Sequence, residues 1–259
     1  MAKPIIITGA SSGIGYELAK VCAAQGHGLV LIARREDLLL SLKAELETAR
    51  GVQVLTYRGD LTDADTRQQF FDWTQAQGIA PYALVNNAGF GDLTAFAEAD
   101  WAKHNAMLQL NIVALTHLTR LYLPGMIARG QGRILNVAST AAFLPGPYMA
   151  VYYASKAYVL SFTDAIAAEL EGTGVTATTL CPGPTESEFQ ERAAAKDAKL
   201  FAIDNMPTAA EVATYGYAAM EKGQRTAVHG TVNKLLSLGT RLLPRKTLAD
   251  VTKGLQKPA

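Results

Sequence analysis

A tyrosine and a lysine four residues apart, Tyr152 and Lys156, are the side chains in this sequence best suited to exchange a proton. On a helix, this spacing places both side chains on one face. With about 6 Å between the charges and an effective dielectric constant of about 20, the ammonium favours the phenolate by roughly 2.8 kcal/mol, or about two pKa units. We therefore expect Tyr152 to serve as an acid and base close to neutral pH.

Other residues distinguish this pair from a chance match. The same spacing occurs at Tyr16 and Lys20, and we interpret that pair as a surface coincidence. Ser139 stands thirteen residues before Tyr152 and could hydrogen-bond a substrate oxygen while the tyrosine exchanges a proton with it. With a nicotinamide cofactor, such a set would reduce a carbonyl group or oxidise an alcohol.

Two neighbouring side chains are rivals for these roles. Tyr153 is one residue away from the lysine spacing and turns about 100° around the helix, so we interpret it as a packing residue. Thr140 could replace Ser139 on chemistry alone, and only the spacing to the tyrosine favours the serine.

A glycine-rich turn near the start of the chain could bind a phosphate group. It lies between the first predicted strand and a predicted helix. Glycine permits a tight turn and a close approach of the backbone to a pyrophosphate, and a helix N-terminus adds free N–H groups. The spacing differs from the common G-x-G-x-x-G fingerprint, so a tight turn without a ligand is the alternative. The residues of the turn expected to contact a dinucleotide are Gly9, Ser11, Ser12, Gly13, Ile14 and Gly15.

The end of the second predicted strand indicates which dinucleotide is bound. An NAD site places an acidic residue there for the ribose 2′-hydroxyl, whereas this chain has Ala33 followed by Arg34 and Arg35. A guanidinium can pair with a 2′-phosphate through two hydrogen bonds. We therefore expect NADP(H), with the alternative that both arginines are solvated residues at a helix start.

Further cofactor contacts are expected where the third and fourth predicted strands end. Asp60 and Leu61 follow the third strand, where the adenine would lie. Asn87, Ala88 and Gly89 follow the fourth strand and are small enough to admit a cofactor, although an Asn-Asn pair can also simply form a turn.

Short β-branched runs alternate with longer helical patterns, which is typical of a parallel sheet with helices on both faces. The strands are expected near 4–8, 28–33, 52–57, 82–86, 132–138, 174–180 and 225–228. The helices are expected near 13–26, 36–50, 62–77, 100–129, 149–171, 208–222 and 231–243. Thr62, Asp100 and Thr208 are plausible helix N-caps, and glycines 26, 51, 78 and 130 fall where helices should end.

Over roughly residues 3–230, the chain resembles the short-chain dehydrogenase/reductase family. The motifs that carry the resemblance are the 8–15 turn, Asp60-Leu61, Asn86-Asn87-Ala88-Gly89, Asn111, Ser139, Tyr152 with Lys156, and Pro182-Gly183-x-Thr185. The resemblance implies a Rossmann-type doubly wound α/β fold of about seven strands in order 3-2-1-4-5-6-7, with the cofactor at the C-terminal edge of the sheet.

The resemblance also implies roles for particular residues. Lys156 would hold the nicotinamide ribose, and Asn111 would hold a water that relays protons to it. Pro182, Gly183 and Thr185 would contact the cofactor.

The C-terminal part departs from the common family pattern. Many members end soon after the last strand with a short segment used in tetramer packing, whereas this chain continues from 231 to 259 with leucines and basic residues. We therefore expect a Rossmann domain over 1–230 and a helical extension over 231–259 that lies on the substrate mouth, a subunit interface, a membrane surface or its own domain. We expect a homo-oligomer, a dimer or a tetramer, although this departure weakens the case for the family's usual tetramer.

The segment 183–207 is a candidate lid over the cofactor. It is the longest stretch without a clear helical or strand register. We expect residues 184–205 to be mobile without a ligand and to close when NADPH binds.

Composition excludes several other classes of protein. A net charge of +1 argues against nucleic-acid binding, and no apolar run approaches the roughly 18 residues of a membrane span. Because a strand begins almost at the N-terminus, we expect no signal peptide and a cytoplasmic location. Cys22 and Cys181 are expected to be buried free thiols, and the four histidines show no metal-ligand spacing, so we expect no metal.

The sequence therefore favours an NADPH-dependent reductase of ketones or aldehydes that also oxidises secondary alcohols. Apolar and aromatic residues at Phe90, 143–149 and Phe189 favour an apolar substrate over a sugar. One alternative is a reductase of 3-oxoacyl thioesters. An alternative of another class is a non-catalytic NADP-binding sensor or scaffold, against which the intact set of proton-transfer residues argues.

Overall fold

The computed structural model describes residues 1–186, 188–189, 193, 206–240 and 242–256 of the 259-residue chain. Seven strands form one sheet in the order β3-β2-β1-β4-β5-β6-β7. They are β1 (Ile5–Thr8), β2 (Leu29–Ala33), β3 (Val54–Arg58), β4 (Ala83–Asn86), β5 (Gly132–Val137), β6 (Val175–Cys181) and β7 (Thr226–Val228). All neighbouring strands are parallel, so their carboxyl ends meet at one edge of the sheet.

The central strands are buried on both faces, which explains their continuous apolar sequences. Every residue of β1 and β2 is buried. Because successive side chains of a strand point to opposite faces, Ile5 and Ile7 pack into one core, whereas Ile6 packs into the other.

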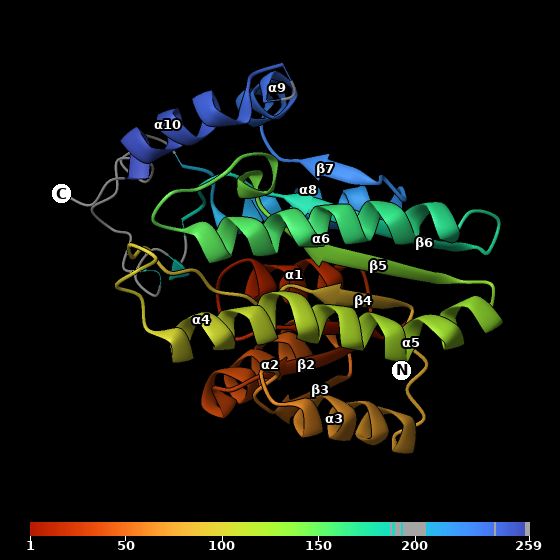
Figure 1. The fold of residues 1–259 in the computed structure, drawn as a ribbon. Helices are drawn as coiled ribbons and strands as arrows, with labels where there is room; N and C mark the ends of the chain where they lie inside the picture. The colour runs from red at the N-terminus through yellow and green to blue at the C-terminus, as the bar shows by residue number, and fades with distance from the viewer. Residues whose placement is uncertain (187, 190–192, 194–205, 241, 257–259) are drawn as a thin grey trace.

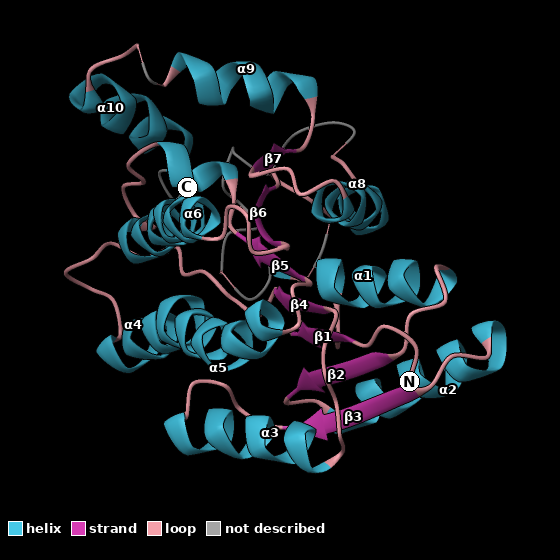
Figure 2. Cartoon of the chain, turned by 90° about the vertical axis from the view of Figure 1, so that its right-hand side faces the viewer, coloured by secondary structure: helices cyan, strands magenta, loops and turns pink. Residues whose placement is uncertain are grey.

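Helices cover both faces of the sheet, as Figure 2 shows. The helices on one face are α1 (Gly13–Ala24), α2 (Glu36–Arg50) and α8 (Ala209–Glu221). Those on the other are α3 (Ala64–Ala76), α4 (Trp101–Leu108), the π-helical turn η1 (Gln109–Ala114), α5 (Leu115–Ala128) and α6 (Ala150–Glu169). A short 3-10 helix, η2 (Thr140–Phe143), follows β5. The predicted fold class and strand order are therefore confirmed.

The ends of the elements follow the local signals with one exception. Asp100 and Thr208 cap their helices, Thr208 through a complete capping box with Glu211. The predicted cap Thr62 is wrong, because the side chain of Asp63 accepts the hydrogen bond from the Thr66 N–H at 2.8 Å and begins α3. All four predicted terminal glycines have positive φ.

The long helix predicted over 100–129 is interrupted. Its α-helical parts, α4 and α5, are joined by the π-helical turn η1. In a π-helical turn the backbone hydrogen bonds join residues five apart, instead of four apart as in an α-helix. Apolar periodicity extends across such a turn, so the sequence pattern does not reveal it.

The C-terminal region contains two helices where the sequence predicted one. They are α9 (Thr231–Gly239) and α10 (Arg245–Gln256), and Pro244 stands immediately before the second. The single helix predicted over 231–243 is therefore wrong at residues 240 and 242–243. In Figures 1 and 2 both helices lie beyond β7, at the opposite edge of the sheet from β3.

Three other expectations concern the chain as a whole. Both cysteines are free and buried, as predicted. Within the described residues, no helix is long and apolar enough to span a membrane. Most of the predicted lid, at residues 187, 190–192 and 194–205, lies outside the described residues.

Candidate functional site

In the turn between β1 and α1, Gly9 lies very close to the backbone of Ala88, and Gly15 lies very close to the backbone of Gly9. Gly9 and Gly13 have φ values of +67° and +56°, which residues with a Cβ rarely adopt. A Cβ built on Gly15 would lie 2.3 Å from the Asn87 side-chain nitrogen and 2.5 Å from the Gly9 carbonyl oxygen. Glycine is therefore required at these positions by the shape of the turn itself.

The start of α1 is suited to an anion. Its N-cap, Ser12, makes no side-chain capping hydrogen bond to the described residues, and its first turn holds no acidic residue. The first N–H groups of a twelve-residue helix, with the positive end of its dipole, are thus left for a ligand. Because free N–H groups and the positive end of the helix dipole meet here without an acidic side chain, the turn fits a pyrophosphate group.

The ends of β1 and β4 are joined by side-chain hydrogen bonds. The Thr8 hydroxyl accepts hydrogen bonds from the Asn87 and Ala88 N–H groups, each at 3.0 Å. The Asn87 amide donates in turn to the Thr8 carbonyl at 2.9 Å. These contacts fix the small residues Ala88 and Gly89 at the carboxyl edge of the sheet, beside the glycine turn.

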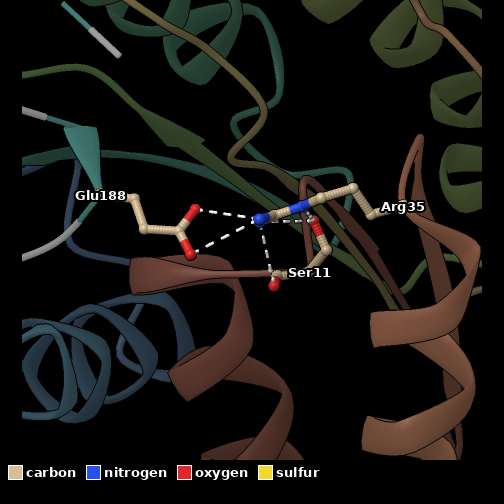
Figure 3. Close-up of polar contacts among 3 residues, drawn as sticks. All are labelled: Ser11, Arg35 and Glu188. Atoms are coloured by element: carbon tan, nitrogen blue, oxygen red, sulfur yellow. Dashed lines mark hydrogen bonds and ion pairs between the residues drawn. The ribbon is translucent and has the colours of Figure 1, made fainter. Parts of the chain in front are cut away.

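The two predicted phosphate-binding arginines have different environments. Arg34 is open to solvent, with a side chain 64% exposed and a contact of 3.8 Å to Asp60. Arg35 donates to the Ser11 carbonyl at 3.2 Å and hydroxyl at 3.3 Å, and it pairs with Glu188 at 3.1 Å (Figure 3). Arg35 therefore connects the glycine turn to the segment after β6, a contact that the sequence did not indicate.

Ser139, Tyr152 and Lys156 come together from η2 and α6. Ser139 is the N-cap of η2, and its hydroxyl accepts a hydrogen bond from the Ala141 N–H at 3.1 Å. Lys156 is only 5% exposed, and its ammonium donates to the Val137 carbonyl at 2.8 Å, at the end of β5. The Lys156 nitrogen lies 5.7 Å from the centre of the Tyr152 ring.

The pKa of Tyr152 differs from the sequence expectation. Burial raises the pKa of this phenol to about 12, and a hydrogen bond with Ser139 offsets only part of the rise. Burial also lowers the pKa of Lys156 to about 8. The predicted shift toward neutrality is therefore wrong for this arrangement, because it left out the cost of removing the phenolate from water.

Asn111 lies behind these residues in the π-helical turn η1. Its side chain is 1% exposed, and its amide donates to the Phe90 carbonyl and the Ser155 hydroxyl, each at 3.0 Å. The Ser155 hydroxyl donates at 2.6 Å to the carbonyl of Tyr152. Asn111 thus reaches the backbone of α6 at the tyrosine and does not itself line the cavity described below.

A row of buried polar side chains supports this arrangement and was not foreseen from the sequence. The Asn86 amide donates to Thr119 at 3.0 Å and to Asn136 at 2.9 Å, and Asn136 donates to Thr163 at 2.9 Å. The row links β4 and β5 to α5 and α6. Because a buried hydrogen-bonded row has few alternative arrangements, it fixes the helices relative to the strand ends.

One cavity of about 920 Å³ joins most of the predicted site residues. Those that line it are Gly9, Ser11, Ser12, Gly13, Ile14, Arg34, Arg35, Asp60, Leu61, Asn87, Ala88, Gly89, Ser139, Tyr152, Lys156, Pro182, Gly183 and Thr185. Gly15 and Asn111 do not line it; they pack directly behind it.

The part of the cavity beside Tyr152 is apolar. Phe90, Leu144 and Met149 pack with Tyr152 and line the cavity, as the sequence predicted, and the ring of Phe189 lies 5.2 Å from that of Tyr152. Phe143 lines the cavity as well. Residues of α9 and α10, among them Gln256, also line the cavity. The substrate mouth is one of the four places where the sequence allowed the 231–259 extension to lie, although no single side chain of that extension was predicted there. Among the described residues, no three His, Cys, Asp or Glu side chains are grouped as metal ligands would be.

Comparisons with known proteins agree with this architecture. A family profile described as short chain dehydrogenase matches residues 3–198. The D-beta-hydroxybutyrate dehydrogenase of Cupriavidus necator is 34% identical over 182 residues, which are 70% of this chain and 70% of that protein. The very-long-chain 3-oxoacyl-CoA reductase of Phaeosphaeria nodorum is 34% identical over 66% of this chain, which spans about half (51%) of that protein.

A solved structure is similar over nearly the whole chain. It is a short-chain dehydrogenase from Sphingobium yanoikuyae in complex with NADPH, 28% identical to this chain. The TM-score is 0.82 over 92% of this chain and 93% of that one.

Proposed function

This chain belongs to the short-chain dehydrogenase/reductase family, and on that premise we propose that it reduces an apolar ketone or aldehyde with NADPH and oxidises the corresponding alcohol in reverse. The observation that carries the proposal is the shared cavity, which joins Ser139, Tyr152 and Lys156 to the glycine turn at the start of α1. A proton donor and a phosphate cradle in one cavity are what this reaction requires.

Each side chain has a definite task in this proposal. A bound nicotinamide dinucleotide supplies or accepts the hydride. Tyr152 gives its proton to the substrate oxygen during reduction and takes it back during oxidation. Ser139 hydrogen-bonds the same oxygen and orients it, while Lys156 holds the ribose of the cofactor. Asn111 positions α6 through Ser155 and the carbonyl of Tyr152.

The acidity of Tyr152 favours reduction near neutral pH. Because burial raises its pKa to about 12, the phenol carries its proton at pH 7, which is the form that a proton donor needs. Oxidation needs the phenolate, so its rate should increase as the solution becomes more alkaline.

Arg34 is the residue proposed to select NADP(H). Its contact with Asp60 is long and exposed, and such pairs contribute about 0–1 kcal/mol, so little is lost when a phosphate replaces the carboxylate. A charge-assisted bidentate contact with a 2′-phosphate contributes about 1.5–3 kcal/mol, or roughly ten- to a hundredfold in preference.

Substitution of Arg34 tests the cofactor choice. In Arg34→Asp, kcat/KM with NADPH should fall about ten- to a hundredfold, while kcat/KM with NADH should not fall. Arg58→Asp is the matched control, because Arg58 makes an equally long, exposed contact of 3.8 Å with Glu36. Equal efficiency with NADH and NADPH in the unmodified protein would contradict the proposal.

Substitution of Gly15 tests the phosphate cradle. In Gly15→Ala, the added Cβ would displace Asn87 or the Gly9 carbonyl, and we expect the affinity for NADPH to fall by at least about tenfold. Calorimetric titration with NADPH measures this loss. Gly254→Ala is the control, because a Cβ there meets no described atom within 4 Å. An unchanged affinity in Gly15→Ala would show that the turn does not bind the cofactor.

A reductase of 3-oxoacyl thioesters remains the second candidate, because one similar protein carries that name. A panel of apolar ketones, aldehydes and 3-oxoacyl thioesters, followed through NADPH consumption, separates the two. A non-catalytic NADP-binding sensor would bind NADPH and transfer labelled hydride to none of them.

A further inference from the structure

The guanidinium of Arg35 is held on two sides, by the glycine turn and by a carboxylate. Its Nε and Nη2 atoms donate to the Ser11 hydroxyl at 3.4 Å and 3.3 Å, and Nη2 also donates to the Ser11 carbonyl at 3.2 Å. Its Nη1 atom faces both carboxylate oxygens of Glu188, at 3.1 Å and 3.5 Å (Figure 3). One edge of the guanidinium therefore contacts the turn, and the remaining nitrogen binds an anion.

This anion-binding nitrogen lies in the cavity that is expected to take the dinucleotide. Arg35, Ser11 and Glu188 all line that cavity, together with Arg34. Arg35 follows the end of β2, where a 2′-phosphate would bind, and Ser11 belongs to the turn that fits the pyrophosphate. The Glu188 carboxylate is thus an anion of the protein itself at a place where an anionic group of the cofactor is expected.

The neighbouring Arg34 has a looser contact. It approaches Asp60 only at 3.8 Å, and its side chain is 64% exposed. The Arg35 side chain is 35% exposed, and its carboxylate partner is closer. A 2′-phosphate carries a charge of about −1.5 to −2 at neutral pH, and a carboxylate beside it repels it. Of the two carboxylates, Glu188 is therefore the one whose position conflicts more strongly with a 2′-phosphate.

The relative strengths of the two contacts decide which anion Arg35 binds. An ion pair as exposed as that of Arg35 with Glu188 contributes at most about fivefold to an equilibrium constant. A charge-assisted contact with a phosphate contributes about ten- to a hundredfold. A 2′-phosphate should therefore displace Glu188, and its affinity should be lowered by about the factor that the ion pair contributes.

We propose that Glu188 is a specificity-determining residue whose carboxylate leaves Arg35 when the 2′-phosphate of NADP(H) binds. The exchange replaces one anion on Nη1 by another, so the guanidinium has a partner in both states. NAD(H) has no 2′-phosphate and leaves the ion pair intact. Glu188 therefore lowers the preference for NADP(H) over NAD(H). The inference rests on the proposed function for the identity of the cofactor.

Removal of the Glu188 charge tests the exchange through binding alone. In Glu188→Gln, calorimetric titration should show an affinity for NADP⁺ increased by about three- to fivefold, while the affinity for NAD⁺ should change by less than about twofold. The two ligands differ only in the 2′-phosphate, so a general effect on the shape of the cavity would alter both affinities. Glu186→Gln is the matched control, because Glu186 is exposed and is not among the described residues that line the cavity. It removes the same charge two residues away and should change neither affinity.

A double-mutant cycle connects the gain to Arg35. In Arg35→Met the affinity for NADP⁺ should start lower, and adding Glu188→Gln should bring little further change, because the group for which the two anions compete is gone. Adenosine 2′,5′-bisphosphate, which lacks the nicotinamide half of the cofactor, should follow the pattern of NADP⁺ throughout the cycle. Glu188→Ala, which keeps no acceptor, replaces Glu188→Gln if circular dichroism shows that the latter has not folded.

Three results would overturn the proposal. An equal loss of affinity for NADP⁺ and NAD⁺ in Glu188→Gln would show that the ion pair persists beside the bound dinucleotide and helps to hold it. An unchanged ratio of the two affinities would show that the phosphate does not compete with Glu188. A gain that persists in full in the Arg35→Met background would assign the effect to repulsion at a distance.

The same titrations separate this proposal from the proposed function. If no ketone is reduced but the affinity for NADP⁺ follows the expected pattern, the proposed function fails and the exchange at Arg35 stands. If ketones are reduced with NADPH and Glu188→Gln leaves the ratio of affinities unchanged, the exchange is wrong and the proposed function stands. If the unmodified protein binds neither dinucleotide, both are wrong.

Discussion

Replacement of Tyr152 by phenylalanine is expected to lower kcat by about 10²–10⁴-fold while leaving the affinity for NADPH nearly unchanged. The ring would keep its contacts with Phe189 and Tyr153, and only the hydroxyl that gives and takes the proton would be lost. Single-turnover rates with NADPH measure the first quantity, and titration of the cofactor measures the second.

Tyr16→Phe is the matched control for this prediction. Tyr16 has the same four-residue spacing to a lysine, and the Lys20 nitrogen lies 5.2 Å from its ring. Its hydroxyl donates to Glu45 at 2.7 Å on the exposed side of α1. Activity should therefore be unaffected in Tyr16→Phe. Most of the activity surviving in Tyr152→Phe would refute the mechanism.

Replacement of Lys156 by methionine should remove activity and at the same time stabilise the fold. The lowering of the lysine pKa from 10.5 to about 8 by burial corresponds to about 3 kcal/mol of unfavourable free energy at neutral pH. Methionine relieves this cost but leaves the Val137 carbonyl without its donor, which costs about 1–3 kcal/mol. We expect a net gain of up to about 2 kcal/mol in the free energy of unfolding, with kcat/KM reduced at least about a hundredfold.

The pH dependence of this gain has a definite sign. Below about pH 8 the lysine is charged in both the folded and the unfolded chain, so the full cost of burying the charge is present. Between pH 8 and the ordinary lysine pKa of about 10.4, the folded chain releases its proton while the unfolded chain retains it, and the cost disappears. Urea unfolding of both proteins from pH 7 to pH 10.5 should show the stability difference shrinking with pH. A difference that grows with pH would contradict this account.

Most of the fold could be predicted because its signals are local. The apolar strands, the terminal glycines and the capping box at Thr208 each act within a few residues. The second C-terminal helix was missed, although Leu248, Val251, Thr252 and Leu255 follow a helical spacing that could have revealed it. The choice of Asp63 over Thr62 as a cap depends on the direction of one side chain, which composition does not specify.

The candidate site was predictable where family motifs mark it and unpredictable where partners are distant in sequence. Gly15 and Asn111 were found by their motifs, but their places behind the cavity follow from packing. The contact of Arg35 with Glu188 and that of Gln256 with Tyr153 join residues more than a hundred positions apart. The acidity of Tyr152 was misjudged because burial, which only the folded chain reveals, raises its pKa by more than the hydrogen bond with Ser139 lowers it.

The π-helical turn η1 also limits how this stretch of the gene can change. It holds one residue more than an α-helical turn, so loss of any one codon within 109–114 would yield an ordinary, continuous helix. The flanking helices α4 and α5 would keep about the same relative orientation, because a π-helical turn takes up its extra residue with little added rotation. The wider turn itself would close, and the Asn111 amide would be displaced from Phe90 and from Ser155 on α6. The number of residues in this segment therefore matters to the site as well as their identity.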